Sequence, residues 1–264
     1  MKSLITTADD FGLNAAVNAA VIEACRDGIL RFASLMVDHP GAEEAVRLAK
    51  ETPQLGVGLH LVMCEDHPEA WGARYFFLPK YRRGIEPKIR AQIEKFLSFG
   101  LTPTHVDGHI NLHVHPAIFP VLARLAKEYG IPRLRLPSGE FSAKEGFAAA
   151  GRTASVEGVV LGTMGKVLRG QARGVYVTPR TYGLLRSGLM HEDYVCHLLS
   201  RLPDGVTEIY FHPTSDPGSA VTDTPTRGHH TITELRTLTS PRLRKALEDY
   251  GIRLVRPGDS LDAR

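Results

Sequence analysis

Short apolar runs alternate with amphipathic segments along most of this chain, and glycine or proline stands at many of the joints. The apolar runs have the length of buried strands, whereas the amphipathic segments repeat their apolar residues at helical spacing. Such alternation favours βα units and a parallel sheet, either closed into a barrel or left open and doubly wound. We predict strands at 4–8, 29–37, 55–62, 131–136, 206–211 and 252–255, a short strand before residue 107, and helices at 14–28, 40–52, 86–99, 116–129, 192–202, 231–239 and 241–250.

Two segments depart from this alternation. Residues 63–85 lack a clear period and include Trp71 with several other aromatic residues, so we expect a long loop there. Residues 137–190 are rich in glycine, which predicts an irregular excursion with short helices. We expect both segments to form walls of a substrate groove, although a locally packed surface loop explains 63–85 equally well. With no internal repeat and a loose tail at 256–264, one domain over 1–264 is the simplest organisation.

The composition places the chain among ordinary globular proteins and narrows its partners. It is 43% hydrophobic and 23% charged, with a net charge of +3 and scattered basic residues. A nucleic-acid-binding face needs a concentrated basic patch, so we expect no nucleic-acid partner. Three cysteines without CxxC spacing favour a reducing compartment. Because no stretch approaches the roughly 18 apolar residues of a membrane span and the N-terminus lacks a signal-peptide core, we expect a cytoplasmic protein without a transmembrane segment.

Four of the twelve histidines fall within one short stretch, residues 104–116. They are His105, His109, His113 and His115. Imidazole is the commonest metal ligand in proteins and a frequent acid or base near neutral pH. A cluster this dense, between a predicted strand and a predicted helix, indicates a chemical site. Any one of these histidines could still be an ordinary hydrogen-bonded loop residue.

Further candidate residues stand at or just after the ends of predicted strands. Asp9 and Asp10 follow the first strand, His60 lies late in the third, and Asp107 and His109 follow the fourth. Proteins with parallel strands place their active sites at the carboxyl ends of those strands, so we expect these side chains to converge. Two simpler interpretations stay open: one aspartate caps the next helix, and His60 is a buried core histidine.

The residue types suggest a metal site that is open to substrate. An aspartate with His60 and His109 would make a three-ligand set with free positions for water and substrate, as catalytic zinc sites have. Either Asp107 or His105 could hydrogen-bond a ligand histidine. His212 ends a late strand and could act as a general acid from the same face, or contact only its own loop.

Four motifs together resemble the YdjC-like carbohydrate deacetylases, which include chitooligosaccharide deacetylase. The motifs are Ala8-Asp9-Asp10-Phe11-Gly12, Gly58-Leu59-His60-Leu61, Thr104-His105-Val106-Asp107-Gly108-His109 with His113, and Tyr210-Phe211-His212-Pro213. Each is weak alone, but all four occur in the family's order and span residues 8–213. Within the family the chain most resembles the branch associated with hopanoid biosynthesis.

The resemblance implies a distorted single-domain (β/α) barrel of the α/β class, with its active site at the carboxyl ends of the strands. It also implies a divalent metal ion held by Asp10, His60 and His109, with Asp9 as the base that activates water. His212 would protonate the leaving amine. The implied reaction removes an N-acetyl group from an amino sugar, and in the hopanoid branch this sugar is the N-acetylglucosaminyl head group of a glycolipid. A homodimer also agrees with the resemblance.

The chain departs from the family pattern directly after the Asp-Gly-His motif. Family members commonly continue with further histidines, whereas Ile110 and Asn111 stand here, with His113 after them. The implied ligands are unchanged, so hydrolysis remains the expectation. A role of His113 beside a ligand or in contact with substrate is left open. The ligand types do not decide between zinc and magnesium.

Two other functions remain open on sequence grounds. A metal-dependent phosphoesterase would also use aspartates and histidines on an α/β barrel, although two-metal sites usually need more carboxylates. The other alternative is a sugar- or lipid-binding protein that performs no catalysis. The complete set of Asp9, Asp10, His60, His109 and His212 favours the hydrolase over this alternative.

Overall fold

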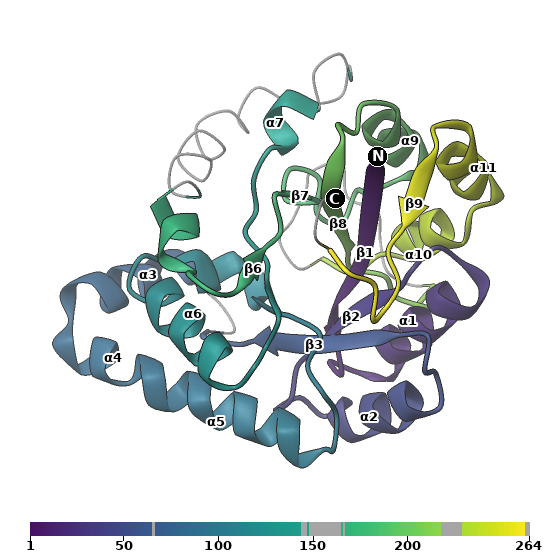
Figure 1. Cartoon of the computed structure of the whole chain (residues 1–264). Coiled ribbons are helices and arrows are strands. Elements are labelled where there is room, and N and C mark those ends of the chain that lie inside the picture. The colour runs from purple at the N-terminus through teal and green to yellow at the C-terminus, as the bar shows by residue number, and fades with distance from the viewer. Residues whose placement is uncertain (65–66, 144–146, 148–164, 166, 218–228, 262–264) are drawn as a thin grey trace.

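In this computed structural model, nine strands among the described residues form one sheet (Figure 1). The structure describes residues 1–64, 67–143, 147, 165, 167–217 and 229–261. Every pairing between these strands is parallel, which confirms the parallel sheet. The strands are β1 (Lys2–Phe11), β2 (Phe32–Leu35), β3 (Gly56–Leu61), β4 (Val106–Gly108), β5 (Arg133–Leu134), β6 (Tyr176–Val177), β7 (Arg180–Tyr182), β8 (Gly205–Phe211) and β9 (Ile252–Leu254).

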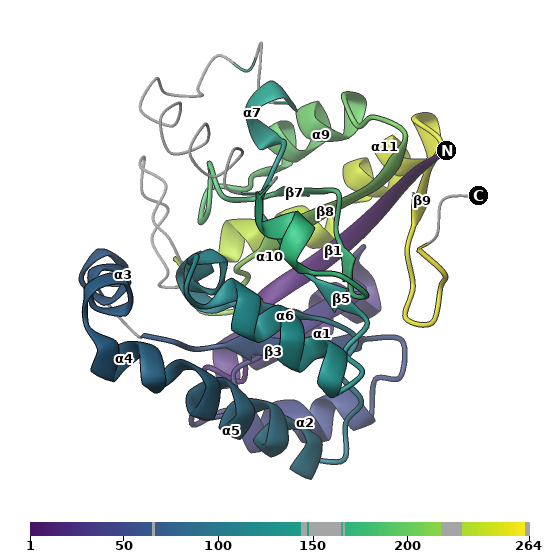
Figure 2. The same cartoon turned by 60° about the vertical axis from the view of Figure 1, so that its left-hand side comes forward.

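The two edge strands, β6 and β7, are neighbours in the sequence and are separated only by Thr178 and Pro179. The strand order is β6-β5-β4-β3-β2-β1-β8-β7, so the sheet must curl until its two edges meet. Figure 2 shows β1 as the long central strand of this curled sheet, with helices outside it. Among the described residues, the covalent chain rather than a hydrogen-bonded ladder joins β6 to β7. The result is the predicted distorted (β/α) barrel, and an open doubly wound sheet is excluded.

Helices cover the outside of the barrel and begin at the expected capping residues. The Asn14 side chain accepts a hydrogen bond from the Val17 amide, and Ser240 caps its helix in the same way. The helices are α1 (Ala15–Asp27), α2 (Ala42–Lys50), α3 (Pro68–Phe77), α4 (Pro79–Arg83), α5 (Ile85–Ser98), α6 (Phe119–Glu128), α7 (Glu140–Ala143), α9 (Glu192–Ser200), α10 (Ile232–Thr239), α11 (Pro241–Asp249) and the 3-10 helix η1 (His109–Val114). Each described helix is too short or too polar to span a bilayer.

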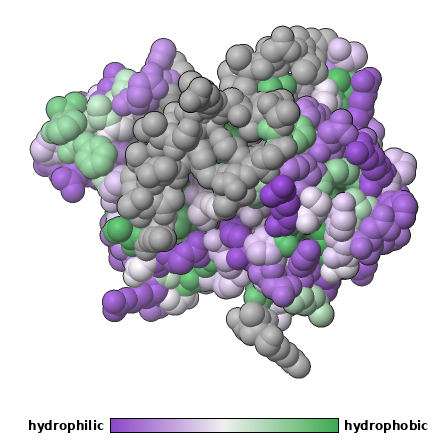
Figure 3. All heavy atoms as spheres, turned by 90° about the horizontal axis from the view of Figure 1, so that it is seen from above, coloured by the Kyte–Doolittle hydropathy of each residue, from purple (hydrophilic) through white to green (hydrophobic). Residues whose placement is uncertain are grey.

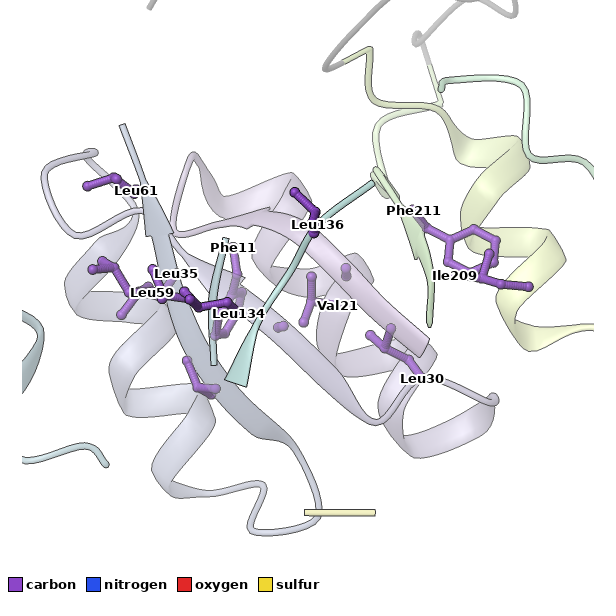
Figure 4. Close-up of a cluster of buried hydrophobic side chains, with 14 of the residues drawn as sticks. Phe11, Val21, Leu30, Leu35, Leu59, Leu61, Leu134, Leu136, Ile209 and Phe211 are labelled. Atoms are coloured by element: carbon purple, nitrogen blue, oxygen red, sulfur yellow. The ribbon is translucent and has the colours of Figure 1, made fainter. Parts of the chain in front are cut away.

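Side chains at alternate positions of a strand point either outward to the helices or inward to the barrel interior. One set packs against the helices in the main hydrophobic core, which includes Leu35, Leu59, Leu134 and Ile209 (Figure 4). A separate small apolar cluster gathers residues from the beginnings of strands and from the segment after β9. Its members are Ile5, Phe32, Val206 and Val255. This cluster closes the end of the barrel at which the strands begin.

Beyond this apolar cluster the interior of the barrel is polar. Arg133 Nη1 lies 2.8 Å from Glu208 Oε2, although four strands separate β5 from β8 in the sheet. Ser34 Oγ on β2 donates to Asp107 Oδ2 on β4 over 2.7 Å, passing β3. Contacts between strands that are not neighbours must cross the interior. The inward side chains of the barrel are therefore joined into a buried polar network.

Glycine at position 58 makes room for a histidine from the next strand. The inward positions of β3 are Gly56, Gly58 and His60, because side chains alternate along a strand. A Cβ atom at Gly58 would lie 2.4 Å from Nδ1 of His105 on the neighbouring segment. His105 therefore fills the layer directly below His60.

The prediction of a loop at 63–85 is wrong. Two helices, α3 and α4, occupy most of this segment. Pro68 and Pro79 stand in the first turns of these helices, where the fixed φ of proline favours helix initiation. The helices are short, and aromatic and charged residues alternate irregularly along them. They therefore lack the clear apolar stripe from which a helix is predicted.

The segment 137–190 contains more regular structure than expected where the structure describes it. It holds α7 and the strands β6 and β7, which at two and three residues are too short to show a period. Residues 148–164 lie outside the described part, as do 262–264 of the predicted tail. Before them, Leu261 packs against the cluster that contains Ile5.

We predict that Gly58→Ala destabilises the fold by about 1–3 kcal/mol, because the added methyl group overlaps the buried His105 ring. Urea unfolding monitored by circular dichroism would measure the loss. Gly170→Ala is the matched control, since a Cβ there meets nothing within 4 Å. Equal midpoints for both variants would show that the close packing at Gly58 has no energetic consequence.

Candidate functional site

Asp9 and Asp10 are adjacent in the sequence, yet both carboxylates reach the barrel interior. They lie within the last residues of β1 rather than after it, which corrects the predicted strand end. The pairing of β1 with β2 shifts register between Ala8 and Phe11, and Asp10 has a φ of 61°. Aspartate tolerates this left-handed conformation better than most residues. The irregularity turns the second carboxylate toward the same end of the barrel as the first.

Asp10 lies at the centre of a group of histidines. Its Oδ1 atom is 3.0 Å from both His60 Nε2 and His109 Nδ1, and its Oδ2 atom is 3.1 Å from His230 Nε2. Atoms that bind one ion at about 2.0–2.2 Å lie about 3 Å from each other. Asp10, His60 and His109 therefore have the spacing of a metal-binding set.

Two buried polar atoms of this group favour a bound cation. Asp10 Oδ2 and His230 Nε2 lie 3.1 Å apart, but neither atom makes a hydrogen bond of good geometry among the described residues. Buried polar groups are otherwise almost always paired. Burial alone would raise the pKa of Asp10, but His60, His109 and His230 lower it well below its usual range. The carboxylate is thus charged, and its donor set suits a divalent ion.

Asp107 fixes the orientation of His60. Its Oδ1 atom lies 2.7 Å from Nδ1 of that histidine, which leaves Nε2 directed at Asp10. A carboxylate behind a ligand histidine is the usual way of setting the tautomer in metal sites. Burial would lower the pKa of His60, yet Asp107 and Asp10 raise it to about 10. The surroundings of His60 therefore favour positive charge.

Arg135 contacts the site, although the sequence motifs did not indicate it. Its guanidinium lies 2.6 Å from Asp9 Oδ2, 2.7 Å from Asp107 Oδ2 and 3.0 Å from Glu208 Oε1. Asp9, His60 and Asp107 are close enough for a second metal-binding set, but both carboxylates already contact this arginine. Charged residues within the predicted apolar strands, at 133, 135 and 208, were the available signal.

Asp9 and His212 face each other across the site. Asp9 Oδ2 is held by Arg135, whereas Asp9 Oδ1 is buried without a hydrogen-bond partner among the described residues. His212 Nε2 lies 4.0 Å from Asp9 Oδ2. Burial raises the pKa of Asp9 to about 6 and lowers the pKa of His212 to about 3. The two groups are thus near enough to exchange a proton through a water or substrate atom.

Glu234 and Ser187 hold His212 in place. The Glu234 carboxylate accepts hydrogen bonds from the backbone amides of His212, at 2.5 Å, and of Met190, at 3.1 Å. Ser187 Oγ lies 3.3 Å from His212 Nδ1. Thr231 and Glu234 have the spacing of a capping box, and Thr231 Oγ1 accepts a hydrogen bond from the Glu234 amide. The Glu234 side chain positions the candidate acid instead of completing the box.

The other histidines of residues 104–116 lie away from Asp10. His105 Nε2 contacts Ser34 Oγ at 3.0 Å, so Asp107 rather than His105 lies against His60. His113 is fully buried, and its Nε2 lies 3.1 Å from the carbonyl oxygen of Arg135. Its contacts place it behind the site. His115 packs against the Phe76 ring, with 4.3 Å between ring centroids.

The two residues that depart from the family pattern, Ile110 and Asn111, form a kink beside the site. Ile110 and Asn111 have φ values of 47° and 56°, within η1. A left-handed conformation is rare for a β-branched residue such as isoleucine and marks local strain. Asn111 Nδ2 donates to the hydroxyl of Tyr210 over 3.3 Å. The kink therefore connects the segment after His109 to the end of β8.

Comparison with protein families matches residues 3–249 to the YdjC-like proteins. The chain belongs to the YdjC-like family. This membership accounts for the common order of the four motifs along the sequence.

Curated relatives of this YdjC-like chain are named carbohydrate deacetylases. The protein of Geobacillus stearothermophilus is 44% identical over 140 residues, covering 48% of this chain and 57% of the relative. The protein of Brevibacillus brevis is 42% identical over 146 residues, covering 49% and 57%. The chain thus matches a little over half the length of these relatives.

Solved structures share the fold. A candidate cellobiose-phosphate cleavage protein from Enterococcus faecalis V583 matches with a TM-score of 0.72 at 24% identity, covering 96% of this chain and 97% of the other. An uncharacterized protein from Agrobacterium tumefaciens C58 matches with a TM-score of 0.54 at 9% identity, covering 96% and 87%. At these identities the likeness concerns the fold alone.

We predict that Glu208→Gln destabilises the protein by about 3–5 kcal/mol near neutral pH, because Arg133 and Arg135 lose a fully buried charge partner. The two arginines hold the pKa of Glu208 at about 2, below its ordinary 4.5. Because folding lowers this pKa, ionised Glu208 stabilises the fold above pH 4.5. This stabilisation is lost as the pH falls toward 2. The free energy of unfolding should therefore fall less steeply with decreasing pH in the variant than in the wild type.

Urea unfolding at a series of pH values would measure both effects. Glu128→Gln is the matched control, because Glu128 also pairs with an arginine, Arg90, but on the surface. Exposed ion pairs contribute little to stability, so this variant should resemble the wild type. The same loss in both variants would contradict the importance of the buried network.

Proposed function

We propose that this chain is a metal-dependent hydrolase that removes an N-acetyl group from an amino sugar. The observation that carries the proposal is the convergence of Asp10, His60 and His109 at one end of the barrel, with Asp9 and His212 beside them. The names of the carbohydrate deacetylase relatives support the same reaction class.

In this proposal Asp10, His60 and His109 bind one divalent ion, zinc or magnesium. When bound, the ion would polarise the acetyl carbonyl and lower the pKa of water. Asp107 holds His60 with Nε2 directed toward Asp10, and His230 lies against the second oxygen of Asp10. The exposed fractions of the His109 and His230 side chains, 15% and 16%, leave this side of the group accessible.

Asp9 acts as the general base. Arg135 fixes its Oδ2 atom, so that Oδ1 is the oxygen free to take a proton from the attacking water. A base works best when its pKa approaches the working pH, and burial moves the pKa of Asp9 in that direction, to about 6. The hydroxide equivalent adds to the acetyl carbon, and acetate leaves as the C–N bond breaks.

His212 delivers a proton to the leaving nitrogen. Because burial lowers its pKa to about 3, the imidazole is neutral before the reaction begins. The proton that it donates must therefore come from the reaction itself, through the proton that Asp9 took from water. The 4.0 Å between Asp9 Oδ2 and His212 Nε2 is compatible with such a transfer. Glu234 holds the backbone of His212 in position for it.

Among acetylated amino sugars, the specific substrate that we propose is the N-acetylglucosaminyl head group of a hopanoid glycolipid. A cavity of about 500 Å³ adjoins the site and is wide enough for a sugar. Its lining includes the start of α1 at Asn14 and Ala15, Thr214 and Asp216 after β8, and His230. Polar groups at its walls suit a sugar better than a lipid chain, so the apolar part would lie outside it.

A two-metal phosphoesterase fits the geometry less well. Such an enzyme needs a second set of free carboxylates close to the first ion. Asp9 and Asp107 would have to provide it, and both are already bound to the Arg135 guanidinium. An acetate-release screen over acetylated sugars, glycolipids and phosphorylated sugars would separate the two activities. No release of acetate by metal-loaded protein would instead favour the non-catalytic alternative.

We predict that Asp9→Asn lowers acetate release by about 10²–10⁴-fold, because the amide cannot accept the proton of water. Metal content should stay near that of the wild type, since Asp9 is not in the proposed ligand set. Asp38→Asn, at an exposed aspartate, is the matched control and should keep full activity. An Asp9→Asn protein as active as the wild type on every substrate would refute the assigned base.

We predict that His60→Gln and His109→Gln each lose bound metal, because each removes a ligand atom next to Asp10. Metal analysis after gel filtration should find about one ion per wild-type chain and far less in the variants. His67→Gln alters an exposed histidine and should retain the ion. Full metal content in both ligand variants would place the ion elsewhere.

A further inference from the structure

The corner between α3 and α4 exposes three large apolar residues in a row. The exposed fractions of Phe76, Phe77 and Leu78 are 51%, 79% and 46%. The other large hydrophobic residues that are exposed in the described part of the chain stand singly in the sequence. We call residues 76–83 the α3–α4 corner. Single exposed apolar residues are normal, whereas a contiguous group indicates a contact surface.

Positive charge adjoins this apolar group. Lys80, Arg82 and Arg83 are exposed, and no carboxylate pairs with them among the described residues. Arg74, one turn before the corner, lies over the Trp71 ring with 4.8 Å to its centroid. The corner therefore combines apolar side chains at its tip with basic side chains at its flank.

The corner stands at the rim of the barrel mouth. The Phe76 ring packs against His115, which directly follows η1, the element that begins with His109. Tyr75 donates to the carbonyl oxygen of Met63, just beyond β3, the strand that carries His60. Figure 1 shows α3 and α4 projecting from the barrel at one side, and Figure 3 shows apolar surface at that side of the molecule.

We propose that the α3–α4 corner docks the protein on an anionic lipid surface. Segments that carry aromatic residues beside Lys and Arg lie in the interfacial region of bilayers, where the rings insert and the cations meet anionic head groups. A second copy of this chain is a poorer occupant, because a symmetric contact would bring two cationic flanks together. Docking itself does not require catalysis.

Docking would also give the barrel mouth access to a lipid-linked sugar. This part of the inference rests on the proposed function, because it requires the site to act on a glycolipid head group. The aromatic tip would enter the interface while the polar cavity beside His230 stays above it. Soluble acetylated sugars would reach the site without docking.

The chain contains its own probe for this contact. Its single tryptophan, Trp71, lies on α3, half-buried and next to the corner. Titration of the full chain with vesicles of phosphatidylcholine alone, or containing phosphatidylglycerol, would follow Trp71 emission and co-sedimentation. We expect a blue shift and quenching by brominated lipid with phosphatidylglycerol vesicles, and binding about ten-fold weaker or more without the anionic lipid.

Paired variants separate the apolar and the electrostatic contributions. Phe77→Ser/Leu78→Ser should weaken vesicle binding about ten-fold or more at any ionic strength. Lys80→Gln/Arg82→Gln should weaken binding only to anionic vesicles and mainly at low salt. The matched controls are Leu97→Ser/Tyr250→Ser and Arg47→Gln/Lys50→Gln, at exposed positions elsewhere on the surface. Both controls should bind as the wild type does.

Acetate release from a soluble acetylated sugar, measured on the same variants, keeps the two proposals apart. Unchanged release with lost vesicle binding supports docking, and absent release in every protein counts against the proposed function alone. Vesicle binding that is absent, or that the corner variants leave unchanged, overturns the docking proposal. So does a dimer, seen by analytical ultracentrifugation, that Phe77→Ser/Leu78→Ser converts to monomers, because the corner would then be occupied by a second copy.

Discussion

One buried guanidinium organises the interior of this barrel. Arg135 contacts the carboxylates of Asp9, Asp107 and Glu208, which come from β1, β4 and β8. A buried charge is tolerated only with close partners, so the arginine and the three acids require one another. The Arg135 cation also lies over the Tyr210 ring, 4.6 Å from its centroid. These contacts hold the strands of an incompletely paired sheet together from inside.

The same network gives two adjacent aspartates different chemical surroundings. Asp9 contacts a permanent cation, whereas both oxygens of Asp10 contact only imidazoles. The left-handed backbone at Asp10 makes this division possible, because a regular strand would send the two side chains to opposite faces. One carboxylate is thus suited to take a proton and the other to bind a cation.

The contacts outside the sheet are mainly apolar, whereas those in the barrel interior are mainly polar and charged. Helices cover the sheet with apolar residues, and the polar groups of the site are reached from the mouth formed by the strand ends. At the rim of this mouth, α3 and α4 present rings and basic side chains to the surroundings. The polar site is therefore enclosed by the barrel, and the α3–α4 corner lies at its rim.

Much of this protein was determined by local sequence. The order of strands and helices follows from apolar spacing, and Asn14 and Ser240 begin their helices through hydrogen bonds that span only two or three residues. Parallel strands align their carboxyl ends, which predicted that Asp9, Asp10, His60, Asp107 and His109 converge. The choice of Asp10 as a ligand came from the family resemblance. Short elements escaped prediction, since β6 has only two residues and α4 only five.

The tertiary structure alone decided the partners of these residues. Arg135 and Asp9 are separated by 126 positions, and nothing local in either segment specifies the contact between them. His230 meets Asp10, and Asp107 rather than His105 supports His60, only because the sheet curls and brings these strand ends together. Hydrophobic spacing determines which residues are buried, but charge pairing inside a barrel depends on which strands face each other across it. That arrangement exists only once the sheet has closed.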